Sequence, residues 1–411
     1  MQSRNLELDR LRAFAVLMTL NFHFTRLFFP WDMFHPYRND STPINILNNS
    51  WTGVDLFLVI SGFIISKTIV KNLDQLRDFN LSQASFVKAF YARRIFRIYP
   101  VAWVVFFAVV IISAVSNQGG YFASLTNNIE AGISIFTYTY NYFAVKMCLN
   151  HTCALAPYWS LSLEEQFYLL LPLFLLLTRS TRQRVWILCG LLMVITFVVR
   201  PLLHDDILIF YMQNRADGLL YGCLIYFLTE QPWFKAIRIS TMQNRTMASL
   251  LTLILVFVLT GIPGVGFSTS LTIPIACLLA SVLVILASFE AGVICFPKPV
   301  EGFLNYLGSR SYSLYLAHMP MLTLTQEIMF RYAANAHEPL GPQLLPYYLV
   351  ISLSLAFAAT ELIYRTVEQP MLAKGKRISE QILNKNGSPP PRPVEEQASQ
   401  NLTINPRVVA E

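Results

Sequence analysis

The chain has 411 residues, of which 54% are hydrophobic and 13% charged, and its formal net charge is +7. A soluble domain carries roughly 25% charged residues. A chain this apolar cannot cover a water-facing surface, so much of it must face lipid. The lysines and arginines lie mostly between apolar runs, where they set the orientation of membrane proteins, and we therefore expect no nucleic-acid partner.

A helix that crosses a bilayer needs about 20 mostly apolar residues. The sequence predicts an all-α polytopic membrane protein with about ten transmembrane helices. The first run lacks a small-residue cleavage site, so we expect it to be retained as a helix. The ten predicted spans are 11–29, 54–70, 99–115, 159–178, 185–203, 211–229, 248–261, 271–289, 303–329 and 346–367.

Positive residues collect on the cytoplasmic side of membrane proteins. Ten spans place the basic clusters of the chain on one side, which predicts that both termini are cytoplasmic. An eleventh apolar run, 129–147, would break this pattern if it crossed, and it is predicted to be re-entrant or interfacial. Residues 1–373 then form the membrane domain. Residues 374–411 are polar and contain a proline-rich run, which predicts a disordered cytoplasmic tail.

The first predicted span contains Arg12 and His23. They are eleven residues apart, which is three helical turns, so they share one face. An ionisable residue inside a membrane is costly and is a functional candidate by default. Histidine ordinarily titrates near neutral pH, so His23 is a candidate general base. The alternative is an interior histidine bonded to a backbone carbonyl. Asp9 is expected to pair with Arg10 or Arg12.

Three arginines, Arg93, Arg94 and Arg97, lie at the start of the third span. Arg94 and Arg97 are three residues apart and therefore neighbours on one helical face. Two guanidinium groups there can bind a phosphate through paired hydrogen bonds. The alternative is that these arginines only enforce membrane orientation.

Two carboxylates, Glu164 and Glu165, open the fourth span. One alternative is a capping role at the helix N-terminus, where negative charge is favoured. The other is that Glu164 orients His23 and that Glu165 binds substrate. Asp55 and Trp159 are further candidates for contact with an acceptor. No metal site is expected. The strongest metal candidate, His151 between Cys148 and Cys153, is better explained by a local disulfide or two free thiols.

Seven motifs in this order resemble acyltransferase family 3 integral-membrane proteins, and together they span nearly the whole chain except the tail. Arg10 and Ala317 depart from the usual pattern, but neither belongs to the proposed chemistry. The motifs are LDRLRA at 8–13 with NFH at 21–23, GVDLFLVISGF at 53–63, FYARRIFRIYP at 90–100, WSLSLEEQFY at 159–168, RADGL at 215–219, SYSLYLAH at 311–318 and YRTVEQP at 364–370.

The resemblance implies transfer of an acyl group, usually acetyl from acetyl-CoA, to a hydroxyl of an extracytoplasmic glycan or lipid-linked sugar. By analogy, His23 and Arg12 carry the catalysis, and Arg94 and Arg97 handle the acyl-CoA. The expected location is the bacterial inner membrane. Some relatives carry a fused extracytoplasmic transferase domain, so we expect this chain either to complete transfer itself or to pass the acyl group to a separate partner.

The competing interpretation is a proton-coupled transporter or flippase of a glycan precursor, which would also use buried ionisable residues. The sequence contains no obvious internal repeat, and this weakens the comparison with transporters built from duplicated halves. Release of CoA by the purified protein would separate the two functions.

Overall fold

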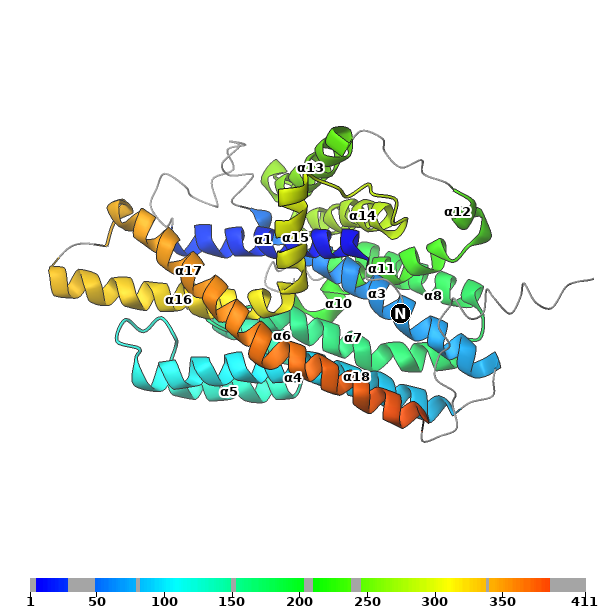
Figure 1. Cartoon of the computed structure of the whole chain (residues 1–411), viewed down its shortest axis with the longest axis horizontal. Helices are drawn as coiled ribbons and strands as arrows, with labels where there is room; N and C mark the ends of the chain where they lie inside the picture. Colours follow the sequence, from blue (N-terminus) through cyan, green and yellow to red (C-terminus); the bar gives the residue numbers. More distant parts are fainter. Residues whose placement is uncertain are drawn as a thin grey trace, which may run out of the picture.

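The computed structural model describes residues 5–28, 49–78, 82–148, 153–202, 210–237, 245–337 and 340–384. These residues form helices joined by loops and contain no strand (Figure 1). The helices are α1 Leu6–Phe28, α3 Gly53–Asp78, α4 Gln83–Val115, α5 Leu125–Phe136, α6 Tyr140–Cys148, α7 Tyr158–Leu177, α8 Thr181–Val194, α9 Arg200–Leu202, α10 Met212–Arg215, α11 Asp217–Thr229, α12 Pro232–Ala236, α13 Arg245–Gly261, α14 Thr269–Ser288, α15 Lys298–Ser309, α16 Ser311–Ala336, α17 Leu345–Ile363 and α18 Gln369–Asn384.

Seven helical segments of the described chain are long and apolar enough to cross a membrane. Each coincides with one of the predicted spans, so the prediction of an all-α membrane protein is confirmed. Helix α11 is apolar but shorter, while α1 and α16 are long but interrupted by ionisable residues. The seven segments are Ser50–Val70, Gln83–Val115, Tyr158–Leu177, Thr181–Leu202, Thr246–Val265, Thr269–Ser288 and Leu345–Leu383.

The prediction of one continuous span over 303–329 is wrong. The chain breaks at Arg310 into α15 and α16, and α15 runs across the direction of most other helices (Figure 1). The Arg310 guanidinium lies 3.9 Å from the ring of Tyr306 and 4.3 Å from that of Tyr364, and its Nε donates to Glu361 at 2.6 Å. These contacts anchor the turn, which an average of hydropathy along the chain does not detect.

The run 129–147, predicted not to cross, belongs to two short helices, α5 and α6. A turn separates them, in which Tyr138 has φ +58°. Helix α5 has 12 residues, or about 18 Å of length, which is too short for the roughly 30 Å core of a bilayer.

The prediction that a disordered tail starts at residue 374 places its start too early in the chain. Helix α18 continues the course of α17 as far as Asn384, and the remainder, 385–411, lies outside the described residues. The helix forms because one of its faces packs on α4. Gly375 makes close approach possible, since a Cβ there would lie 2.7 Å from Cβ of Phe96, and Lys374 Nζ lies 5.4 Å from the centroid of the Phe96 ring.

Helices α3 and α11 pack along one another more extensively than any other pair of described helices, and they lie side by side in Figure 1. A Cβ on Gly62 would lie 2.2 Å from the carbonyl oxygen of Leu219, and one on Gly222 would lie 2.3 Å from that of Val59. Only glycine permits this backbone approach, which is the usual way that membrane helices gain packing energy.

Candidate active site

Two histidines from distant parts of the chain meet inside the bundle. His23 Nδ1 on α1 lies 3.0 Å from His318 Nε2 on α16. His318 is fully buried, and its Nδ1 lies 2.6 Å from the backbone carbonyl oxygen of Tyr315. His23 is half-buried. The predicted base is therefore turned towards protein and has an ordered partner on one ring nitrogen.

One face of α7 carries a row of polar groups beside this pair. Ser160, Glu164 and Tyr168 are four residues apart and so lie one above another along about 12 Å of helix. Ser160 Oγ lies 2.6 Å from the hydroxyl of Tyr315, whose ring centroid is 5.9 Å from that of His318. Glu164 accepts hydrogen bonds from Ser61 at 3.0 Å and from Tyr168 at 2.6 Å.

The far end of this row reaches the arginines of α4. Arg94 Cζ lies 5.2 Å from the ring centroid of Tyr168, and the Arg94 guanidinium interacts electrostatically with Arg97 and Glu164. Arg93 is directed differently and interacts with Glu380 on α18. The structure thus brings together Arg94 and Arg97, and it separates Arg93 from them.

Arg12 lies on the same side as these arginines. Its Nη1 is 3.1 Å from Asp9 Oδ1, which confirms one of the two pairings expected for Asp9. The carboxylate of Glu368 interacts with both Arg12 and Arg97 and also accepts a hydrogen bond from Ser313. Arg12 therefore belongs to the arginine end of the site, about 16 Å along α1 from His23.

Asp55 does not face this site. Its side chain has no exposed area, its Oδ2 lies 2.9 Å from Arg215 Nη2, and Cys277 Sγ contacts its other oxygen at 3.7 Å. The prediction that Asp55 contacts an acceptor assumed an open carboxylate, whereas the structure buries it in an ion pair. Trp159 packs near the same pair, with its ring centroid 5.8 Å from Arg215 Cζ.

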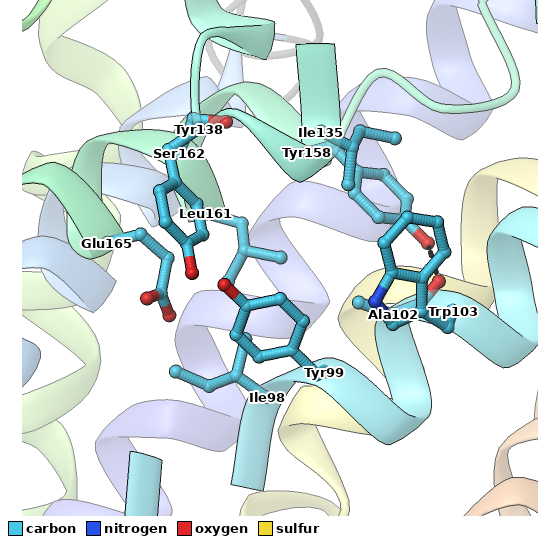
Figure 2. Close-up of a pocket in the computed structure, with 10 residues that line it drawn as sticks. All are labelled: Ile98, Tyr99, Ala102, Trp103, Ile135, Tyr138, Tyr158, Leu161, Ser162 and Glu165. Carbon is cyan, nitrogen blue, oxygen red and sulfur yellow. Dashed lines mark hydrogen bonds between the residues drawn. The ribbon is translucent and has the colours of Figure 1, made fainter. Parts of the chain in front are cut away.

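Glu165 lines a small pocket between α4, α5 and α7 with a volume of about 20 Å³. The hydroxyl groups of Tyr99 and Tyr138 point towards its carboxylate, while Trp103 lies at the opposite, apolar side (Figure 2). The Oε1 atom of Glu165 is buried without a hydrogen-bond partner among the described residues. Such an atom is costly unless a ligand or water bonds to it.

Sequence reasoning did not place three contributors in the site. His318, Ser160 and Tyr168 appeared there only as members of motifs, and their contacts were not predicted. The four-residue spacing of Ser160, Glu164 and Tyr168 was a readable signal that they share one face. The contact between His23 and His318 joins residues 295 positions apart, and no local pattern reports it.

Among the described residues, no group of three histidines, cysteines or acidic side chains could hold a metal ion. The side chain of Cys148 and all of His151 lie outside the described residues. The buried polar groups of the site are instead hydroxyls, carboxylates, imidazoles and guanidinium groups, which are suited to proton transfer and to binding an anion.

The histidine pair inside the bundle, the polar row on α7 and the arginines of α4 form an arrangement that is chemically suited to group transfer. The family model of the acyltransferase domain matches residues 5–365, and the chain belongs to this family, acyltransferase family 3.

Three relatives illustrate the likeness. The chain is 25% identical over 398 residues to a putative peptidoglycan O-acetyltransferase of Bacillus subtilis, covering 90% of this chain and 55% of that protein. It is 25% identical over 407 residues to the peptidoglycan O-acetyltransferase OatA of Listeria monocytogenes, with 90% and 56% covered. It is 28% identical over 395 residues to a putative O-acetyltransferase of Staphylococcus aureus, with 90% and 57% covered. The chain thus spans about half the length of these relatives. No solved structure matches it.

Proposed function

We propose that this chain is a membrane O-acyltransferase that moves an acyl group, acetyl in the first instance, from cytoplasmic acyl-CoA to a hydroxyl of an extracytoplasmic or lipid-linked carbohydrate. His23 is the general base. The observation that carries the proposal is the polar row on α7, which runs from the histidine pair to Arg94 and Arg97. It connects a proton acceptor to an anion-binding end inside one helical bundle.

In this proposal Arg94 and Arg97 bind the phosphates of CoA. Their guanidinium groups interact electrostatically and come from one helical face, and phosphate is an anion that paired arginines bind well. The pantetheine arm then lies along Ser160, Glu164 and Tyr168, whose oxygens can hydrogen-bond its amides, and brings the thioester towards His23. Arg12 assists at the phosphate end, because it interacts with the same carboxylate as Arg97, that of Glu368, and lies about 16 Å along α1 from His23.

The reaction balances without an added cofactor. His23 takes the proton of the acceptor hydroxyl as that oxygen attacks the thioester carbonyl. The carbon–sulfur bond of the tetrahedral intermediate breaks, and the CoA thiolate receives the proton from the imidazolium. The products are an O-acyl ester and free CoA.

The acceptor is proposed to be a glycan, with peptidoglycan as the first candidate because relatives bear that name. Glu165 and Trp159 are proposed to contact it: Glu165 has an unpartnered oxygen in an aromatic pocket, and aromatic faces stack well on sugars. The proposed location is a bacterial cytoplasmic membrane with both chain termini inside. Completion of the transfer by a separate extracytoplasmic protein is a variant of the same proposal.

Mass spectrometry of envelope glycans from cells with and without the gene tests the function, because loss of an acyl mass is expected when the gene is absent. Purified protein should release CoA from acetyl-CoA in the presence of acceptor, and His23→Ala should abolish that release while the protein remains in the membrane. A transporter would release no CoA, and unchanged activity of His23→Ala would remove the mechanism.

A further inference from the structure

We propose that His318 is a positioning residue that fixes the tautomer of His23 and leaves its Nε2 as the basic atom. The inference rests on the proposed function, because it concerns how the same base is oriented.

The argument begins at the backbone carbonyl of Tyr315. A carbonyl oxygen only accepts hydrogen bonds, so the His318 Nδ1 that lies 2.6 Å from it must carry a proton. A second carbonyl, that of Leu314, lies 3.3 Å from the same nitrogen. In a neutral imidazole one nitrogen donates and the other accepts. The Nε2 of His318 therefore presents a lone pair.

That lone pair faces His23. Because the His318 Nε2 accepts, the His23 Nδ1 at 3.0 Å must donate, and the proton of neutral His23 resides on Nδ1. The remaining nitrogen, Nε2, then holds the lone pair that a general base requires. A carbonyl on α16 thus acts on the protonation of a ring on α1 through one intervening imidazole, together with the backbone carbonyl of Thr19 on α1, which also accepts from His23.

The same contact restrains the ring. His318 is fully buried within α16, so its own orientation is fixed by packing as well as by the two carbonyls. When His23 gains the acceptor proton and becomes an imidazolium, its Nδ1–H still donates to His318. The contact therefore also holds the charged ring in place at the step that needs it.

The test compares two substitutions at one position. His318→Leu removes the acceptor, whereas His318→Gln keeps an oxygen acceptor near the position of Nε2. We expect kcat for acetyl transfer to fall at least tenfold in His318→Leu, because part of the roughly 10²–10⁴-fold contribution of a general base is lost. The KM for acetyl-CoA should change less than threefold. His318→Gln should recover most of the lost kcat.

Thr323→Val is the matched control, because its buried hydroxyl lies on the same helix without a hydrogen-bond partner among the described residues. It should leave kcat unchanged. Thermal unfolding in detergent is measured for all variants, so that a loss of folded protein is separated from a loss of kcat.

Equal kcat in wild type and a folded His318→Leu would overturn the inference, and so would a His318→Gln variant as impaired as His318→Leu. His23→Ala separates a failure of the proposed general base from a failure of the positioning role of His318. If His23→Ala remains active, the proposed general base itself fails. If only His23→Ala is inactive and His318→Leu is normal, the proposed function stands and the positioning role falls.

Discussion

The buried ion pair between Asp55 and Arg215 gives the sharpest prediction, because two roles for Asp55 have opposite consequences. Both side chains are at most 2% exposed, and their atoms approach to 2.9 Å. Two further nitrogens of Arg215, Nε and Nη1, are buried without a hydrogen-bond partner among the described residues. The Asp55 carboxylate therefore provides most of the stabilisation of the buried positive charge on Arg215.

Asp55→Asn removes the negative charge without changing the volume of the side chain. Removing one partner of a buried pair costs about 3–5 kcal/mol, because the other charge stays buried and uncompensated. A protein whose total stability is on the order of 5–15 kcal/mol loses a large part of it. We expect a marked fall in thermal stability in detergent and in the folded yield from membranes, with per-molecule activity retained.

Asp55→Leu combined with Arg215→Met should recover most of that stability, since replacing both charges by apolar groups is often neutral. Glu230→Gln is the control, because it breaks the exposed pair with Lys235, which is worth at most about 1 kcal/mol. The reasoning is refuted if Asp55→Asn unfolds like wild type and its only change is a higher KM for the acceptor. That outcome would restore the substrate-binding role.

Three further substitutions test other parts of the structure. Arg94→Ala should raise the KM for acetyl-CoA about 10- to 100-fold in a steady-state assay, since a charged hydrogen bond contributes roughly 1.5–3 kcal/mol. Arg93 interacts with α18 instead, so Arg93→Ala should change this KM little. Gly222→Leu should abolish recovery of monodisperse protein on size exclusion, because the new side chain would meet the α3 backbone. Gly190→Leu should be recovered normally, because nothing lies within 4 Å of the added Cβ. Ser61→Ala should keep kcat within about tenfold of wild type, because Ser61 donates to Glu164 and is not a nucleophile in direct transfer. An acyl-enzyme that mass spectrometry detects in wild type and not in this variant would contradict direct transfer.

Local pattern was enough to predict the helices and the residues of the first span. Arg12 and His23 lie on one helix as the three-turn spacing requires, and the arginine spacing predicted that Arg94 and Arg97 lie together. What failed depended on distant partners. Asp55 was taken for an open carboxylate because its partner, Arg215, is 160 positions away.

The break at Arg310 was missed for a related reason. The contacts that stabilise it come partly from Tyr364 and Glu361, which are reached only after α16 and α17 have folded back. Hydropathy reports whether a segment can enter lipid, and it does not report where a half-buried arginine interrupts the helix.

Helix α18 has a practical consequence. The match to the family ends at residue 365, but the helix that follows lies along α4, contacts Phe96 and interacts with Arg93. A truncation placed at the end of the family match would keep six of the seven motifs named above intact and still remove the helix that packs against the α4 backbone carrying Arg94 and Arg97. For expression, the chain should therefore extend at least to the last turn of α18 at Asn384, beyond the point where the family match stops.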